Sequence, residues 1–174
     1  PLTNGVSPVL ISRAVISAQR ISLQLFDAGL PVAPTVPHIN LQGGAADCAS
    51  TGKAMPRDTV ESLFRSGIAW GHRLGSEANS AYVILGECVV GGTTTALALL
   101  MGLGFPAADK IGSSHVVCNH SQKSAIAQQG LASWSDFRNS HQPVDPLDLV
   151  AAIGDPMQIV VAGMAISASY HGGV

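Results

Sequence analysis

The sequence predicts an α/β fold: a mostly parallel sheet covered by helices, in a Rossmann-like three-layer architecture. Two observations carry this prediction. Segments with strand character alternate with segments of helix character, which is typical of parallel sheets with helical crossovers. The composition is 47% apolar and only 11% charged over 174 residues, so the chain must bury much of its surface and is long enough for one domain.

The first part of the chain reads as helix, strand, long loop and helix. Ser7-Pro8 is typical of a helix start and predicts a helix over 8–20. Residues 21–26 alternate as a strand, and residues 30–56 carry four prolines, which predicts an extended excursion. A capped helix is expected over 58–75. The predicted inward-facing side chains of the two helices are Val9, Leu10, Ala14 and Ile16, and Val60, Leu63, Phe64, Ile68 and Leu74.

The middle of the chain predicts two further strands and two helices. Residues 81–85 read as a buried strand, and residues 93–103 as a helix that Gly104 would end in a left-handed cap. A short strand over 110–117 and a short helix over 122–131 would follow. This order places a turn between a strand and a helix near residue 90.

Two Asp-Pro pairs open the last helices. Asp145-Pro146 would begin a helix that stops at Gly154, and Asp155-Pro156 one that continues to about Tyr170. The chain then ends where another strand would be due, and it also begins in mid-pattern. We therefore expect residues 1–174 to be a single α/β domain from a longer protein, truncated at both ends.

Composition and charge exclude several classes of partner. The formal charge is −2 and no Lys/Arg cluster occurs, so no nucleic acid is expected. Residues 88–108 lack charge, but glycines, threonines and Pro106 break them into a turn and a short helix, so no membrane span is expected. Three cysteines without a familiar spacing and no signal peptide indicate a cytoplasmic protein. So apolar a surface predicts self-association, most simply a homodimer.

The segment GECVVGGTTTA, residues 86–96, is the strongest functional signal. Gly91 and Gly92 let a ligand approach the backbone, and the following threonines supply hydroxyls at a helix N-terminus, which favours an anion such as phosphate. An ordinary strand–helix turn with a threonine cap is the alternative. Glu87 is a carboxylate inside an apolar segment, and a buried carboxylate is costly unless it is used or paired. We therefore favour a ligand site.

Two other clusters are weaker. His115, Cys118 and His120 match no zinc spacing, so no metal is expected. They more readily line a loop beside the ligand, where Ser113 and Ser114 would offer hydroxyls. The N-terminus of the last helix, at Gly154 and Asp155, is a second possible anion or ribose position. Asp155 can equally be no more than an N-cap there.

Three ordered blocks resemble the nicotinate-nucleotide–dimethylbenzimidazole phosphoribosyltransferases of cobalamin biosynthesis. The first block is similar to their GE-x4-[GN]-TTT-A loop. GSSHVVCNHSQK, residues 112–123, lies where those enzymes carry a glycine-rich run ending in lysine. DPLDLVAAIGDPMQIVVAGMA, from residue 145, is similar to their PLD-x-LA-x-[VI]-GGFEIAAMAGA segment. The resemblance is closest to the cyanobacterial and archaeal branch of the superfamily, which is also similar over the first forty residues.

The resemblance implies a phosphate site in this chain but does not supply a general base for the reaction. It assigns the ribose phosphate to the loop and a lysine, and it places Glu87 near the ribose or base, in an electrostatic or orienting role. The phosphate-binding residues would be Gly91, Gly92, Thr93, Thr94, Thr95 and Lys123. The GGFE turn has become Gly154-Asp155-Pro156-Met157 here, and the family's general base would lie beyond this chain. Lys123 alone would read as an ordinary solvated lysine.

Three functions follow as expectations. The first is phosphoribosyl transfer from nicotinate mononucleotide to a heterocyclic base, dimethylbenzimidazole or adenine, without a cofactor. The second is a non-catalytic nucleotide- or phosphate-binding module of the same fold. The third, an unrelated phosphate-binding hydrolase, is disfavoured because the sequence lacks paired carboxylates, a Ser-His-Asp arrangement and a metal cluster.

Overall fold

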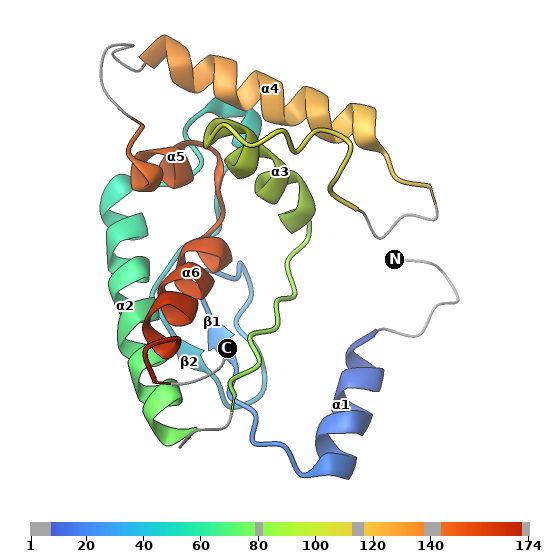
Figure 1. The fold of residues 1–174 in the computed structure, drawn as a ribbon, viewed down its shortest axis with the longest axis vertical. Helices are drawn as coiled ribbons and strands as arrows, with labels where there is room; N and C mark the ends of the chain where they lie inside the picture. Colours follow the sequence, from blue (N-terminus) through green and yellow to red (C-terminus); the bar gives the residue numbers. More distant parts are fainter. Residues whose placement is uncertain (1–7, 79–81, 113–116, 138–143, 172–174) are drawn as a thin grey trace.

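The computed structural model describes residues 8–78, 82–112, 117–137 and 144–171, and these residues form helices around a very small sheet (Figure 1). The elements in chain order are α1 (Pro8–Gln19), β1 (Phe26–Asp27), β2 (Ile39–Asn40), the 3-10 helix η1 (Ala49–Thr51), α2 (Arg57–Glu77), α3 (Gly92–Gly102), α4 (His120–Phe137), α5 (Pro146–Ile153) and α6 (Pro156–Ala168).

The pairing of α2 with α6 is the main packing contact of the molecule. These helices lie against one another through glycines, because Gly67, Gly71 and Gly75 on α2 recur every four residues and share one face. A Cβ built on Gly71 would lie 2.3 Å from the carbonyl oxygen of Met164 on α6. On the other helix, a Cβ on Gly163 would lie 2.7 Å from the carbonyl oxygen of Phe64. The two backbones therefore touch, and only glycine fits between them.

Around this pair lie two groups of buried apolar side chains. The first joins α2 and α6 to the loop before α2, with Val60 and Leu63 almost fully buried. The second joins α3, α4 and α5 through Leu97, Ala127 and Leu149. A Cβ on Gly130 of α4 would lie 2.3 Å from the carbonyl oxygen of Ala49 in η1. The upper helices in Figure 1 are thus fixed to the α2–α6 pair through α5 and η1.

The sheet is far smaller than the sequence predicts. β1 and β2 are parallel, as expected, with Phe26 opposite Ile39 and a 2.8 Å hydrogen bond from the N–H of Ile39 to the carbonyl oxygen of Leu25. The structure has no strand at residues 21–25, 83–89 or 110–112. Tyr82 makes only an isolated β-bridge. An extended segment becomes a strand only when a neighbour pairs with it, and apart from the bond to Leu25 these segments show no such pairing among the described residues. Residues 113–116 of the predicted third strand lie outside them.

Burial of the segment before α3 also differs from expectation. Only one face of the predicted buried strand at 81–85 is covered: Tyr82 is 71% exposed and Ile84 is 72% exposed, whereas Leu85 is half-buried against the first apolar group. Glu87 is exposed as well. The argument that Glu87 is a costly buried charge is therefore wrong, because this residue lies at the surface.

α1 is a helix where the sequence predicts one, but its apolar side chains are not buried. Val9 is 55% exposed, Leu10 is 56% exposed, Ala14 is exposed and Ile16 is half-buried. Figure 1 shows α1 standing apart from the other helices at the end of an extended segment. The inner stripe expected for α1 therefore has no partner surface in the part of the chain that the structure describes.

The predicted helix boundaries elsewhere hold to within a few residues, with one exception. α2, α3, α5 and α6 begin within one residue of their predicted starts, and Gly104 has a φ of +87°, as its left-handed cap requires. α4 runs from 120 to 137 rather than from 122 to 131, because its packing against α3 and η1 extends it. Within the described ranges, no helix has both the length and the apolar character needed to cross a membrane.

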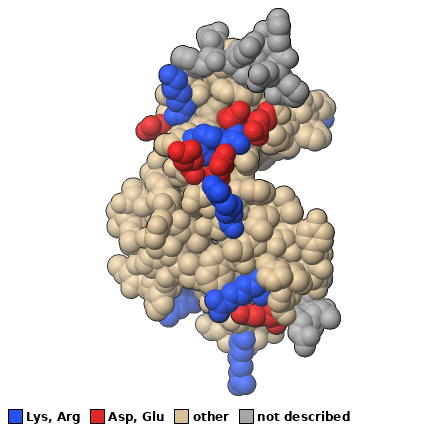
Figure 2. Space-filling view, turned by 90° about the vertical axis from the view of Figure 1, so that its left-hand side faces the viewer, with Lys and Arg blue, Asp and Glu red and all other residues tan. Residues whose placement is uncertain are grey.

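Charged side chains gather where α2 meets the start of α5 (Figure 2). The guanidinium of Arg57 lies 3.0 Å from Glu61 and 3.0 Å from Asp145, and it also contacts Asp148. Asp145 is the N-cap of α5, accepting a 2.8 Å hydrogen bond from the N–H of Leu147. That N–H is the first cause holding the pKa of Asp145 below its ordinary value, and Arg57 lowers it further. The cap and the ion pair together fix α5 against α2.

Asp145→Ala is expected to lower the free energy of unfolding by about 1 kcal/mol at neutral pH, because it removes an N-cap. Since the pKa of Asp145 is depressed in the folded state, its contribution is present above the unfolded pKa of about 3.9 and is lost as pH falls through the folded value. Urea titrations of both proteins at neutral pH and near pH 2 would measure this. If the difference in free energy of unfolding between the two proteins is the same at both pH values, the prediction is contradicted.

Candidate anion-binding site

The first turn of α3 presents the backbone groups that the sequence predicts for an anion. Gly91 is the N-cap with φ +85° and ψ −2°, a left-handed conformation that glycine adopts freely, and it supplies no capping side chain. The N–H groups of Thr94 and Thr95 both donate to the carbonyl oxygen of Gly91, at 2.8 and 3.3 Å. The N–H groups of Gly92 and Thr93 donate to no described residue. Two donors at the positive end of the helix dipole are thus without a described acceptor; Thr93 is exposed and Gly92 is buried.

Glu87 folds back over this turn. Its Oε2 accepts a 3.0 Å hydrogen bond from the N–H of Val89 and lies 3.7 Å from the position that a Cβ on Gly92 would occupy. The carboxylate is therefore beside the N-terminus of α3 without bonding its amides. In this position it can interact with a ligand group bound at the turn.

Thr95 is engaged inside the protein. Its hydroxyl lies 3.0 Å from the carbonyl oxygen of Gly92 and 2.7 Å from Oδ2 of Asp155, at the start of α6. Asp155 is the N-cap of α6, and Gln158 completes a capping box with it. The two helix starts that the sequence singled out as anion positions are thus hydrogen-bonded to each other. Of the two possibilities for Asp155, the structure shows the N-cap; both of its carboxylate oxygens accept hydrogen bonds. Gly154, just before it, is buried.

Gln158 is the residue that sequence reasoning overlooked. Its amide donates a 3.0 Å hydrogen bond to the Thr95 hydroxyl, and its side-chain oxygen accepts from the N–H of Asp155 at 3.2 Å. The sequence did carry a signal, because an Asp followed three residues later by Gln has the spacing of a capping box.

Lys123 is buried rather than solvated, with 3% of its surface exposed. Its Nζ donates to the carbonyl oxygens of Ile111, at 3.2 Å, and Gly112, and lies 3.9 Å from Sγ of Cys118. No carboxylate lies within ion-pair distance of it among the described residues. A buried ammonium group held only by neutral groups is costly, and an anion beside it would lower that cost.

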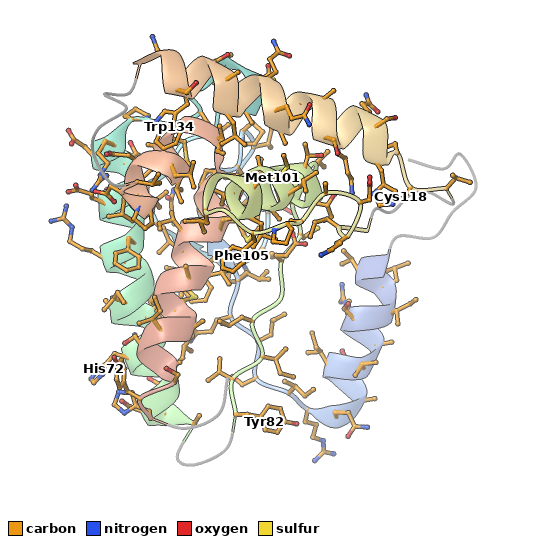
Figure 3. The ribbon with its side chains drawn as sticks, turned by 45° about the horizontal axis from the view of Figure 1, so that its top comes forward. His72, Tyr82, Met101, Phe105, Cys118 and Trp134 are labelled. Atoms are coloured by element: carbon orange, nitrogen blue, oxygen red, sulfur yellow. The ribbon has the colours of Figure 1, made fainter. Side chains whose placement is uncertain are left out.

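The structure does not bring every predicted residue to one place. No hydrogen bond in the described part of the chain joins Lys123 to the α3 turn. Figure 3 shows Cys118 beside the start of α4, and Tyr82 near the opposite end of the molecule. Ser113, Ser114 and His115 lie outside the described residues.

Other features of the described surface do not add to the site. In the described ranges, no three His, Cys, Asp or Glu side chains are grouped to hold a metal ion. Sγ of Cys118 and Nδ1 of His120 are 3.6 Å apart. A surface hollow of about 220 Å³ is lined by Glu61, Phe64, Arg65 and Leu147, and it lies between α2 and α5, away from all the predicted site residues.

Comparison with known proteins gives a consistent answer. The model of a phosphoribosyltransferase family, that of the nicotinate-nucleotide–dimethylbenzimidazole enzymes, matches residues 12–174. UPF0284 proteins match the whole chain: alr0297 of Nostoc sp. is 58% identical, that of Crocosphaera subtropica 53% and sll1500 of Synechocystis sp. 51%. The chain covers 47%, 47% and 46% of these proteins, about half the length of the curated relatives it matches.

Two solved structures from Thermus thermophilus share the fold. One is described as CobT, and the other as a nicotinate-nucleotide–dimethylbenzimidazole phosphoribosyltransferase. They are 18% identical to this chain, with TM-scores of 0.63 and 0.61. Each match covers 98% of this chain, and 54% and 53% of the respective structure. These matches confirm the α/β fold class.

Proposed function

This chain belongs to the nicotinate-nucleotide–dimethylbenzimidazole phosphoribosyltransferase family, and we propose that the protein transfers a phosphoribosyl group from nicotinate mononucleotide to a heterocyclic base. The products would be nicotinate and an α-ribosyl phosphate nucleotide, the lower-ligand nucleotide of cobalamin. The observation that carries the proposal is the open first turn of α3, with two N–H groups that donate to no described residue, in the loop that resembles the family's phosphate loop.

In the proposed reaction this chain holds the phosphate. The N–H groups of Gly92 and Thr93 would donate to its oxygens, the hydroxyl of Thr94 would add to them, and Lys123 would supply positive charge. Lys123 would reach the phosphate only if the loop of Ile111 and Gly112, which now accepts its hydrogen bonds, rearranged around the ligand.

At the ribose, the bond from the anomeric carbon to the pyridine nitrogen breaks, and its electron pair leaves with nicotinate. A nitrogen of the incoming base then forms the new bond and gives up its proton to a general base. The ring carbon gains positive charge as nicotinate departs, so the Glu87 carboxylate would stabilise it or orient the ribose hydroxyls. We assign no residue of this chain as the general base, and the acceptor, dimethylbenzimidazole or adenine, stays open.

The full-length protein is expected to release nicotinate and form a ribosylated base when incubated with nicotinate mononucleotide and candidate bases. Mass spectrometry of both products is the measurement. Glu87→Gln is expected to lower kcat by about 100- to 1000-fold, the range seen on removing one electrostatic group that acts on the transition state. Asp109→Asn, an exposed carboxylate on the loop after α3, is the matched control and should leave kcat unchanged.

A non-catalytic module is the second candidate, and one observation favours it: no described residue is placed as a general base for the acceptor. Saturable binding of nicotinate mononucleotide without nicotinate release, for every base tried, would support the module and reject the enzyme. The absence of both binding and turnover would reject both candidates.

We also propose that the protein is a cytoplasmic homodimer that binds a small-molecule nucleotide and a heterocyclic base and needs no cofactor, nucleic acid or membrane. The support for the dimer is exposed apolar surface on α1 and the segment after it. The side chains concerned are Val9, Leu10, Ile11, Val15, Ile21, Leu23 and Leu25, each at least 39% exposed. Exposed apolar side chains gathered on one part of a chain are a mark of interaction sites.

Ile11→Glu is expected to convert the full-length dimer to monomer at micromolar concentration, because a charge would have to be buried in the contact. Light scattering after size exclusion would measure the mass. Ser12→Glu, on the same helix, is the control for added charge on α1. A wild-type protein that runs as a monomer, or an Ile11→Glu protein that stays dimeric, would contradict the prediction.

A further inference from the structure

The start of α3 is joined to the start of α6 by hydrogen bonds among Thr95, Asp155 and Gln158. Each Asp155 oxygen accepts one bond, Oδ1 from the N–H of Gln158 at 3.1 Å and Oδ2 from the Thr95 hydroxyl at 2.7 Å. The Gln158 amide group donates to the same hydroxyl at 3.0 Å. Asp155 is 6% exposed, so these bonds are largely shielded from water. They join residues that are 60 and 63 positions apart in the chain.

The Thr95 hydroxyl also reaches the anion-binding turn. It lies 3.0 Å from the carbonyl oxygen of Gly92, in the peptide group whose N–H belongs to Thr93. Because a peptide group is planar, fixing its C=O fixes the direction of its N–H. That N–H is one of the two open donors of the turn. A hydroxyl has a single proton, so Thr95 donates to either Gly92 or Asp155 at one moment while Gln158 keeps its oxygen in place.

We infer that Gln158 is a positioning residue for the anion site: its amide holds the Thr95 oxygen in place, and the Thr95 hydroxyl fixes the first turn of α3 when it donates to Gly92 rather than to Asp155. The sequence suggested that Thr95 contacts the phosphate. In this inference Thr95 instead holds the peptide group that makes the contact. This inference rests on the proposed function for the identity of the ligand. Pre-organised donors are worth more than donors that must be ordered on binding, so loosening the turn weakens binding without removing any contact to the ligand.

The central variant is Thr95→Val, which keeps the shape of the side chain and removes the hydroxyl, and Thr95→Ser is the variant that restores it. The matched control is Ser135→Ala. Ser135 makes the same kind of bond, from its hydroxyl to the carbonyl oxygen three residues earlier, at 2.7 Å within α4. All variants are made in the full-length protein.

Two readouts separate this inference from the proposed function. Exchange of the hydrogen-bonded amides in the first turn of α3, residues 94–96, is expected to speed up about tenfold in Thr95→Val and to stay near wild type in Thr95→Ser and Ser135→Ala. The KM for nicotinate mononucleotide is expected to rise about tenfold in Thr95→Val with kcat little changed, because the phosphate contact is the same in ground and transition states.

The inference is overturned if exchange in that turn is unchanged in Thr95→Val, or if it rises equally in every helix. It is also overturned if Thr95→Ser behaves like Thr95→Val. If the wild-type protein neither binds nor converts the mononucleotide, the proposed function fails, and the exchange rates still decide whether Thr95 holds the turn. Faster exchange in α3 with an unchanged KM would reject the positioning role.

Discussion

Lys123→Gln and Lys123→Met are both expected to weaken binding of nicotinate mononucleotide by about 10- to 100-fold, the range that losing one hydrogen bond to a charged group predicts. The reason is the setting of the ammonium group. The residue is almost fully buried, and within the described residues its Nζ is held by two carbonyl oxygens and one sulfur atom, without a carboxylate. We propose that the phosphate of the mononucleotide is the partner of this charge.

The two variants distinguish the loss of the Lys123 positive charge from the loss of its hydrogen bonds to the loop. Gln keeps two N–H donors for the carbonyl oxygens of Ile111 and Gly112, and Met keeps only the apolar stem. Isothermal titration with the mononucleotide measures the affinity, and thermal unfolding without ligand measures the cost to the fold. If Gln binds like wild type and only Met loses affinity, the lysine holds the loop and its charge is not used. Lys110→Met, at an exposed lysine, controls for the change in net charge.

Gly71→Ala is expected to destabilise the protein by about 3 kcal/mol, the upper part of the range for inserting a group into a packed core. In an exposed helix the same substitution would stabilise by roughly 0.5–1 kcal/mol, because alanine has the higher helix propensity. Here the added Cβ would lie 2.3 Å from the carbonyl oxygen of Met164 and 2.7 Å from its Cα. These are backbone atoms, so α2 and α6 must move apart along their whole contact.

Urea unfolding of wild type and variant gives the difference in free energy. Gly44→Ala is the control, since a Cβ there would meet nothing within 4 Å, and its effect should stay within about 0.5 kcal/mol. A Gly71→Ala protein as stable as Gly44→Ala would mean that the two helices are not in backbone contact. The predicted outcome is independent of any ligand and therefore tests the fold alone.

The helices were predictable because their signals are local. Asp145-Pro146 and Asp155-Pro156 start α5 and α6 as expected, and Gly104 follows α3 in the left-handed conformation. The Gly–Thr turn was found for the same reason, since its glycines and threonines lie within a few residues, although the N-cap is Gly91 rather than a threonine. Strands were not predictable in this way. Residues 21–25 and 83–85 have strand composition, but pairing depends on neighbours that are distant in the chain.

Burial was the other point at which local pattern failed. The stripe of α1 and the apolar residues before α3 read as core, yet Leu10 and Ile84 are exposed. Lys123 read as solvated and is buried. Hydropathy shows that a side chain favours burial; whether a covering surface exists is decided by the packing of other elements.

The sequence by itself determined the family, the helix starts and the position of the Gly–Thr turn that we propose binds an anion, because each depends on residues adjacent along the chain. Only the tertiary structure decided that Thr95 and Gln158 meet, that Lys123 is buried, and that α2 and α6 touch through glycine. Those facts depend on which backbone segments approach one another although they are far apart in the chain. That approach is set by the packing of whole helices rather than by any local pattern.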